Sequence, residues 1–586
     1  MSDGRLPVRR RWLRWTIGVI VTLIVLAIGW VGIRGIGAVN DLQQVSAASS
    51  KLKQAIGQGD LDTAATLSAR IAHHAGSAHD LTSDPIWSGF GLLPWLGPNF
   101  SAVSDVAEIA DDVASDALVP VLAAAEELDL ASLGLSGGVV DLTPFAQIEP
   151  PLAEASATLT SAETRALDID AGATIPPLAD AVREMRSAVT QAATVVGALH
   201  GASALLPSML GGEGPRNYVL AMQNNAELRS SGGIIGAIAL LHAENGRITL
   251  VQQASVPDFP SLDTPLPLSE STVALFEDSP GRYMQNLTSI PDFTEAGPAI
   301  AARWQNRFGH PIDGVIAVDA VMTENLVAAT GPLTFGPFSA TKDTVVGLLI
   351  SEIYASVPDP AAQDEIFSQA AGALLSAALT EAAPKDLVAA LAESADEGRI
   401  RIWSAHEDEE AILSASTLGG ALPEDGPQTH VGVLFNDTTG GKMDFYADAA
   451  ITTSIGTCDG EPTTQVTVTW KNDAPADAGT ALPPYVTANG FYGVPAGSTR
   501  TLITVYGPEG ATPSHIDRDG EEVSVQTALL GSRSAVQHEV LLAPGESSTI
   551  TVEYQGTGAG ERLTVVDHTP MVIAPDVSRE QLRCAS

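Results

Sequence analysis

The chain has 586 residues, a formal net charge of −40 at pH 7 and two cysteines. This length predicts about three or four domains with enough apolar residues for several cores. The strong acidity argues against a nucleic-acid binder, because binding to phosphate backbones requires clustered Lys and Arg side chains on at least one face.

The N-terminus carries the densest basic cluster, and an uncharged apolar run over residues 15–33 follows it directly. A run of this length can cross a bilayer, which needs about 20 residues. A cleaved signal peptide is the alternative, but the run is longer than a usual signal core and has no clear small-x-small cleavage site up to its end. The cluster consists of Arg5, Arg9, Arg10, Arg11 and Arg14.

The positive-inside rule places such a basic N-terminus in the cytoplasm. We therefore expect a cytoplasmic tail over residues 1–14 and a single-pass transmembrane helix over 15–37 that contacts the lipid bilayer. The bulk of the chain is then extracellular, at the cell membrane. In that setting Cys458 and Cys584 could form a disulfide, and two unpaired thiols are the alternative.

Residues 38–210 are rich in Ala, Leu, Asp and Glu and predict an α-helical bundle, with helices over 41–76, 99–129, 151–169 and 178–206 separated by prolines. His73, His74 and His79 are expected on the surface, because neighbouring histidines on a helix point in different directions. No metal site is predicted from them or from the cysteines. Residues 85–100, with Trp87 and Trp95, favour a buried elbow between helices over a lipid-contacting loop.

Residues 211–427 predict a central α/β domain that begins with a strand, a polar turn and a second strand over 218–241. Asn245-Gly246 then predicts a hairpin turn into a partner strand over 248–252. The polar turn is expected at the end of a buried sheet, where binding sites are commonly built. Its candidate ligand-binding residues are Asn224, Asn225, Glu227, Arg229, Gly232 and Gly233.

Strands and helices alternate through the rest of this domain, which indicates α/β layers. Asp292 followed by Glu295 predicts a capping box for a helix over 293–308. Adjacent carboxylates at Asp408, Glu409 and Glu410 predict a solvated helix face. The other expected elements are a strand over 312–319, helices over 320–330, 341–356 and 361–395, a strand over 400–404 and a short helix over 407–416.

Residues 428–575 change to short alternating runs rich in Thr and Val, typical of an antiparallel β-sandwich. A tail over 576–586 follows. The predicted strands cover 431–436, 447–455, 465–471, 500–506, 523–529, 535–542, 548–554 and 562–566.

Several of these stretches, taken in order, resemble the motifs of the domain-of-unknown-function family 4012 (DUF4012). They are NNAELRSSGG (224–233), ENGR (244–247), PDF (291–293), DGVIAVD (313–319), TGP (330–332) and GKMDFY (441–446). The family comprises membrane-anchored proteins common in Actinobacteria and other Gram-positive bacteria, so the resemblance implies a cell-envelope protein. It implies no established activity, which leaves a structural, ligand-binding or interaction role.

The order of these elements is also similar to that of the LytR-CpsA-Psr domain, whose members transfer lipid-linked glycopolymer to peptidoglycan. On that resemblance Arg229 would clamp a diphosphate, and Gly232 and Gly233 would let backbone N–H groups approach it. Asp292 or Asp319 would hold Mg²⁺ or activate the acceptor hydroxyl. The catalytic candidates are therefore Arg229, Asp292 and Asp319.

The same residues have a purely structural interpretation. Glu227 and Arg229 could form an ion pair that braces the turn, and Asp292 could only cap its helix. Gly232 and Gly233 could only satisfy backbone geometry. A non-enzymatic envelope protein and a phosphotransferase acting on cell-wall glycopolymer are the two hypotheses that the structure must separate.

Overall fold

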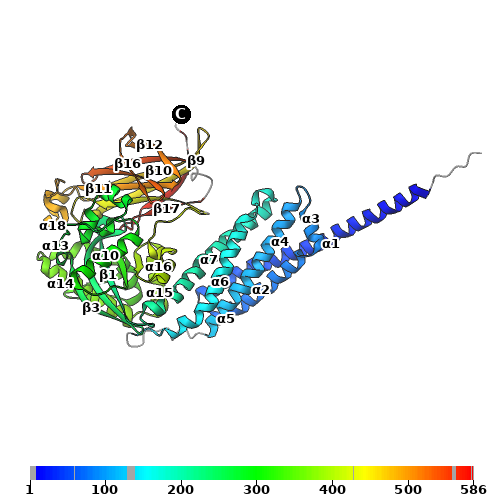
Figure 1. Cartoon of the computed structure of the whole chain (residues 1–586), viewed down its shortest axis with the longest axis horizontal. Helices are drawn as coiled ribbons and strands as arrows, with labels where there is room; N and C mark the ends of the chain where they lie inside the picture. The colour runs from blue at the N-terminus through cyan, green and yellow to red at the C-terminus, as the bar shows by residue number, and fades with distance from the viewer. Residues whose placement is uncertain are drawn as a thin grey trace, which may run out of the picture. The chain divides into compact units, whose positions relative to one another are not determined.

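The computed structural model describes residues 8–58, 60–127, 139–426, 428–556, 563–582 and 584. The chain divides into two compact units, Met1–Leu133 with Asp141–Pro207, and Gly134–Val140 with Ser208–Ser586. The first unit is helical, and the second contains a central α/β region followed by sheets (Figure 1). This succession was predicted, whereas the domain boundaries stay predictions. Arg5 and the boundary at residue 427 lie outside the described residues.

Long helices make up the first unit, and alanines and leucines pack between them, as in the cluster of Ala64, Leu67 and Ile71 with Leu52. A π-helical segment, η1 (Val113–Leu118), links two of the helices without a break. The helices are α1 (Val8–Gly57), α2 (Leu61–Thr82), α3 (Pro85–Gly91), α4 (Gly97–Asp112), α5 (Val119–Glu127), α6 (Thr143–Asp168) and α7 (Pro176–Met209).

Two of the predicted helix boundaries in the first unit are wrong, and in the second unit the helix expected over 361–395 is divided, because one helix ends at Thr380 and the next begins at Pro384. The helix expected over 41–76 is divided, because α1 ends at Gly57 and Asp60 starts α2 by accepting a hydrogen bond from the backbone N–H of Thr63. The break expected at Pro150 and Pro151 does not occur, since both lie inside α6. A proline removes one backbone hydrogen bond and crowds the preceding turn, but a long packed helix can continue through it.

The apolar N-terminal stretch is helical. Residues 15–37 lie within α1, and the part Val25–Gly57 is long and apolar enough to be a candidate membrane span. The helix α7 passes the same test of length and composition. Among the described side chains, α1 leaves Leu26, Ile28 and Ile33 exposed. Membrane insertion and orientation stay predictions.

A five-stranded mixed sheet forms the centre of the second unit, in the order β3-β2-β1-β4-β7. β1 (Arg216–Arg229) runs parallel to β4 (Gly314–Asp319) and antiparallel to β2 (Gly232–Glu244). The predicted Asn245-Gly246 turn connects β2 to β3 (Arg247–Ser255), and β7 (Ile400–Ser404) closes the other edge. Both turn residues have positive φ, which suits this residue pair.

The helix α10 (Phe293–Phe308) packs on the sheet through Phe293, Ile300 and Trp304, and its bounds match the prediction. The remaining helices of this region are α8 (Glu270–Phe276), α9 (Ser279–Arg282), α11 (Met322–Thr330), α12 (Lys342–Gly347), α13 (Ile353–Ser356), α14 (Pro360–Thr380), α15 (Pro384–Asp396) and α16 (Glu407–Ser414). Short strands β5 (Leu333–Phe335) and β6 (Phe338–Ala340) form a separate hairpin.

Two sheets make up the C-terminal region, in the orders β13-β12-β16-β10-β9-β18 and β14-β15-β11-β8-β17. They share one core, in which Phe435 of β8 stacks on Trp470 of β10 with ring centroids 4.4 Å apart. The strands are β8 (Gln428–Asp437), β9 (Ala447–Cys458), β10 (Glu461–Asn472), β11 (Thr499–Glu509), β12 (Ala511–Arg518), β13 (Glu521–Glu522), β14 (Gln526–Leu530), β15 (Arg533–Leu542), β16 (Ser547–Gly556), β17 (Leu563–His568) and β18 (Asp576–Gln581).

The sequence prediction missed three of these strands, which are β12, the two-residue β13 and β18. β12 contains Pro513 and an irregular register between Pro513 and His515, which disrupts the alternation of apolar and polar residues. β18 lies in the predicted tail and has no buried side chain, so no apolar pattern marks it.

Candidate functional site

The end of β1 carries the polar cluster, and it differs from the predicted turn. Asn224 pairs with Ile234 and Leu228 pairs with Gly233, so residues 225–227 form a bulge without partners in β2. The chain reverses only at Ser230 and Ser231. A bulge re-aims side chains, and here it directs the polar residues into the interior rather than onto an exposed turn.

Glu227 is the centre of a buried charged cluster. Its Oε1 lies 3.0 Å from Nη2 of Arg229, and its Oε2 accepts a hydrogen bond from the Lys442 ammonium. The exposed fractions of Glu227, Arg229 and Lys442 are 6%, 7% and 8%. Burial alone would raise the pKa of Glu227, but the charges of Lys442 and Arg229 lower it below its ordinary value. Burial opposes the charge of Lys442, but the Glu227 carboxylate raises the pKa of that ammonium.

The guanidinium of Arg229 has internal acceptors. Nη1 donates to the backbone oxygens of Leu228 and Asp437 at 2.8 and 3.2 Å. Nη2 donates to Glu227 and, at 3.4 Å, to Oδ1 of Asn286. The two nitrogens that would clamp a diphosphate are therefore engaged inside the protein.

Two further acids, Asp437 and Asp444, adjoin this cluster. Asp444 Oδ2 accepts from the backbone N–H of Leu228 at 2.8 Å, and Asp437 Oδ2 accepts from that of Gly440 at 2.8 Å. Burial and the negative charge of Glu227 raise the pKa of Asp437 to about 6. Burial and the charge of Asp437 raise the pKa of Asp444 well above its ordinary value. Burial and the mutual repulsion of the two carboxylates therefore both favour the protonated forms of these acids.

Asp319 lies at the end of β4 in a second buried network. Its Oδ2 accepts from Nδ2 of Asn225 and from Nη1 of Arg399, both at 2.9 Å, and its Oδ1 accepts from the backbone N–H of Met322. Burial raises the pKa of Asp319, although the Arg399 charge opposes that rise. Asn225 and Arg399 also donate to the backbone oxygens of residues 570 and 571.

Asn224 also faces inward. Its Oδ1 accepts from the backbone N–H of Ala226, and its Nδ2 donates to the hydroxyl of Tyr354, both at 2.9 Å. Tyr354 stacks on Tyr485 with ring centroids 5.3 Å apart, and burial raises its pKa to about 12. The amide of Asn224 thus connects the bulge to a pair of aromatic rings.

The glycines after the bulge fit close to the backbone of β1. A Cβ on Gly233 would lie 2.3 Å from the carbonyl carbon of Asn224, and Gly232 has φ +137°, which side chains rarely adopt. The N–H of Gly233 donates to Oε1 of Gln223 at 2.9 Å. Strand packing therefore accounts for both glycines.

Asp292 caps α10, because its Oδ1 accepts from the backbone N–H and the hydroxyl of Thr294 at 2.9 and 2.7 Å. The predicted capping box with Glu295 is wrong. Glu295 instead accepts from the hydroxyls of Ser269 and Thr272 at 2.9 and 2.7 Å, and so braces the start of α8.

The acidic face of α16 differs from its prediction at Glu409, whereas Asp408 is exposed as predicted. Glu409 is 7% exposed rather than solvated. Its carboxylate accepts from the hydroxyls of Ser208 and Ser404 at 2.8 and 2.6 Å and contacts Arg216 Nη2 at 3.3 Å. Three partners from other segments remove Glu409 from water, and a local charge pattern cannot reveal such partners.

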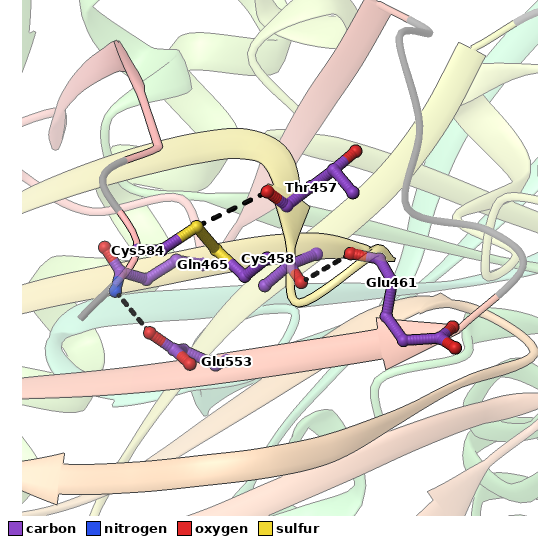
Figure 2. Close-up of a disulfide and its surroundings, with 7 residues drawn as sticks. Thr457, Cys458, Glu461, Gln465, Glu553 and Cys584 are labelled. Carbon is purple, nitrogen blue, oxygen red and sulfur yellow. Dashed lines mark hydrogen bonds between the residues drawn. A yellow bond between two sulfur atoms is a disulfide. The ribbon is translucent and has the colours of Figure 1, made fainter. Parts of the chain in front are cut away.

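Cys458 and Cys584 are joined by a disulfide, which attaches the end of the chain to β9 (Figure 2). Nearby, Gln465 donates to Glu553 at 2.9 Å between β10 and β16. Across the described ranges, no group of three or more His, Cys, Asp or Glu side chains is arranged to hold a metal ion. His74 contacts Asp41 instead, with Nδ1 and Oδ1 2.8 Å apart.

Residues 213–354 match the model of a family described as "Protein of unknown function (DUF4012)". The match confirms the resemblance of this stretch to DUF4012. It contains β1 to β6, α8 to α12 and the first half of α13, and therefore the bulge with Glu227 and Arg229. The other half of the charged cluster, Lys442, Asp437 and Asp444, lies beyond the DUF4012 stretch.

Two solved structures are similar over part of the chain. The transcriptional regulator yvhJ from Bacillus subtilis is 12% identical, with a TM-score of 0.21, and the similarity covers 35% of this chain and 77% of that one. The Lin1025 protein from Listeria innocua is 9% identical, with a TM-score of 0.21, and the coverages are 38% and 86%. These values are too low to carry an argument. No curated protein matches the chain.

The structure thus brings together Asn224, Glu227 and Arg229 in one cluster and places Asn225 with Asp319 in the other, while Asp292 remains at its helix. Sequence reasoning anticipated the pair of Glu227 and Arg229 and singled out Asp319, but it assigned no role to the other partners of these residues. Lys442 and Asp444 belong to the GKMDFY motif, which lies between two predicted strands. These two charged residues in a short connection were the signal that could have indicated a role for them in the site. The partners that it missed are Tyr354, Arg399, Asp437, Lys442 and Asp444.

Proposed function

We propose that this protein is a single-pass, membrane-anchored cell-envelope protein whose second compact unit serves as an extracytoplasmic structural or interaction module. The helix α1 is the anchor, with the basic N-terminus in the cytoplasm. The helices of the first unit form a membrane-proximal bundle, and the two C-terminal sheets form a β-sandwich, an architecture common in cell-surface proteins. Cell-wall glycopolymer or peptidoglycan is the class of partner to test.

The disulfide supports the extracytoplasmic location. Cys458 and Cys584 are both engaged in it. Structural disulfides persist in oxidising compartments and are rare in the reducing cytosol. A chain that is anchored by its N-terminal helix and exported to the outside of the membrane would be expected to have both features, the apolar N-terminal helix and a disulfide.

The observation that carries the non-enzymatic part of the proposal is the environment of Arg229. Both terminal nitrogens of its guanidinium donate to acceptors within the protein, and its side chain is paired with Glu227. A diphosphate clamp needs these forked donors free to face a ligand. Asp319 is likewise occupied by Arg399, Asn225 and a backbone N–H.

A binding and stability experiment tests this part. The full chain in detergent is titrated with a polyprenyl diphosphate, with and without Mg²⁺, as wild type, as Arg229→Ala and as Arg247→Ala. Arg247 is the matched control, because it is exposed in the hairpin between β2 and β3. We expect no saturable binding by any of the three proteins and a lowered unfolding midpoint for Arg229→Ala alone.

The transferase hypothesis gives the opposite result. Saturable binding by the wild type that is lost in a normally folded Arg229→Ala protein would overturn the structural proposal. Asp319 would then be the next residue to test, since it is the other catalytic candidate with a buried carboxylate.

A further inference from the structure

A loop of apolar residues protrudes from the first unit between α3 and α4. It covers residues 92–96, with the sequence LLPWL, and we call it the apolar loop. Leu92 and Trp95 are 88% and 92% exposed, and Leu96 is 59% exposed. The expectation of a buried elbow is thus correct for Trp87, which is 3% exposed, and wrong for Trp95.

The structure holds the apolar loop in a defined shape. The N–H of Gly97 donates to the carbonyl of Leu93 at 2.8 Å, and a Cβ on Gly97 would lie 2.2 Å from the carbonyl oxygen of Gly91. At the base of the loop, Trp87 packs edge-on against Phe100 and donates from Nε1 to its carbonyl at 3.1 Å. A fixed turn that presents large apolar side chains to the outside indicates a contact surface.

The apolar loop is attached to α1 close to the end of its uncharged run. Arg34, the first charged residue after residues 15–33, pairs through Nε with Oδ2 of Asp84 at 3.0 Å. Asp84 also caps α3 by accepting from the backbone N–H groups of residues 86 and 87. Gly35 lies against Trp87, because a Cβ there would be 3.4 Å from the indole. Figure 1 shows α3 beside α1, at the end of the helical region from which the N-terminal part of α1 extends.

We propose that the apolar loop inserts into the interfacial zone of the same bilayer that α1 crosses. The inference rests on the proposed membrane anchor, because that anchor puts the surface of the bilayer near Arg34 and therefore near the base of α3. An exposed tryptophan beside leucines suits the interface, where its apolar ring and its N–H group both find partners. Ile175 extends the surface, being 57% exposed and bonded through its N–H to Asn99, close to the loop.

The chemistry of the loop specifies what kind of lipid contact this is. Residues 85–100 contain no charged side chain, so the contact depends on burial of apolar surface and not on attraction to anionic headgroups. We therefore infer a second attachment point, which fixes the direction in which the helical region leaves the membrane.

The test uses the full chain reconstituted into phosphatidylcholine vesicles, with a polarity-sensitive fluorophore attached through Trp95→Cys. The matched control carries the same label through Ile56→Cys, an exposed apolar position about 33 Å beyond Arg34 along α1 at about 1.5 Å per residue. The native cysteines are joined in the disulfide, so the introduced thiol is the one that reacts. Quenching by nitroxide-labelled lipid is compared with quenching by aqueous iodide.

We expect nitroxide lipid to quench the label at position 95 at least threefold more strongly than the label at position 56, with no change on adding anionic lipid or salt. Equal lipid quenching at the two positions in a chain that floats with the vesicles overturns the loop contact and leaves the anchor intact. If the label at position 95 is shielded from iodide but is not quenched by nitroxide lipid, the loop contact with the bilayer is also overturned. The apolar loop is then covered by protein. A chain that does not float with the vesicles overturns the anchor, and with it the loop contact, before the labels are compared.

Discussion

The ammonium group of Lys442 contacts the carboxylate of Glu227, 215 residues earlier in the chain. Glu227 lies in the bulge of β1, and Lys442 lies in the segment between β8 and β9. The contact therefore joins the central sheet to the C-terminal sheets by a buried ion pair. Such a pair favours one arrangement of these sheets, because separating them would leave an unpaired charge in the interior at a high cost in free energy.

Replacing Glu227 should be more damaging than replacing Lys442. Glu227→Gln leaves two buried cations without a counter-charge, and we expect a loss of about 3–5 kcal/mol in the free energy of unfolding. Lys442→Met leaves Glu227 paired with Arg229, so its loss should be smaller. Urea denaturation of the full chain in detergent measures both values.

The exposed pair of Lys471 and Asp473 provides the control, because solvent screens it and Lys471→Met should leave the unfolding midpoint unchanged. If Lys442→Met destabilises the protein as much as Glu227→Gln, Arg229 does not compensate the carboxylate as described.

Asp437 should make stability depend on pH in a defined window. Its pKa is raised from 3.8 to about 6 in the folded protein, so the unfolded chain loses this proton first as pH increases. The free energy of unfolding therefore falls between pH about 4 and 6 and stays lower above pH 6. Asp437→Asn removes this decline. The free energy of unfolding of the variant, relative to that of the wild type, should therefore increase by up to roughly 3 kcal/mol from pH 4 to pH 6. A constant difference between the two proteins from pH 4 to 6.5 would contradict the raised pKa.

Gly233→Ala should destabilise the central sheet. The added Cβ would lie 2.3 Å from the backbone of Asn224, which cannot move without changing the bulge. We expect a loss of at least 2 to 3 kcal/mol, roughly as for other overpacked interior positions. Gly236→Ala, in the same strand but exposed and with 3.8 Å to its nearest neighbour, should be neutral or stabilising by thermal unfolding.

Reducing the disulfide should release β18 while the core stays folded. All six residues of β18 are exposed, and β18 is held by its hydrogen bonds to β9, by the hydrogen bond from Arg579 to the Thr564 carbonyl and by the Cys458–Cys584 bond. Hydrogen exchange on the reduced protein should show fast exchange at Asp576–Gln581 and unchanged protection in β10 and β16. Loss of protection in β10 as well would mean that the disulfide supports the whole sheet.

The local elements of this fold could be predicted from the sequence where the signal is local. Asp292 marked the start of α10, and Asn245-Gly246 marked the hairpin between β2 and β3. In both cases residues adjacent in the chain determine the conformation through a cap or a positive φ.

The environment of the candidate site could not be predicted in this way. Glu227, Asn225 and Glu409 have partners about 200 residues away or more, at Lys442, Pro570 and Ser208 respectively. A single sequence does not indicate which distant residues are in contact. A carboxylate that is buried with a partner and one that is exposed to solvent therefore cannot be distinguished from their local sequences. The bulge was missed for a related reason, since strand register depends on the partner strand.

The central sheet is not complete within the DUF4012 stretch that contains most of it. β4 pairs on its outer side with β7, which begins 46 residues after that stretch ends at residue 354, and Asp444 and the backbone of Pro570 bond to the bulge from further away still. A recombinant fragment cut at the family boundaries would therefore expose the edge of β4 and leave the polar bulge without its cover, and such edges promote aggregation. Fragments intended for crystallisation or binding assays need to extend from before Ser208 to beyond the disulfide at Cys584.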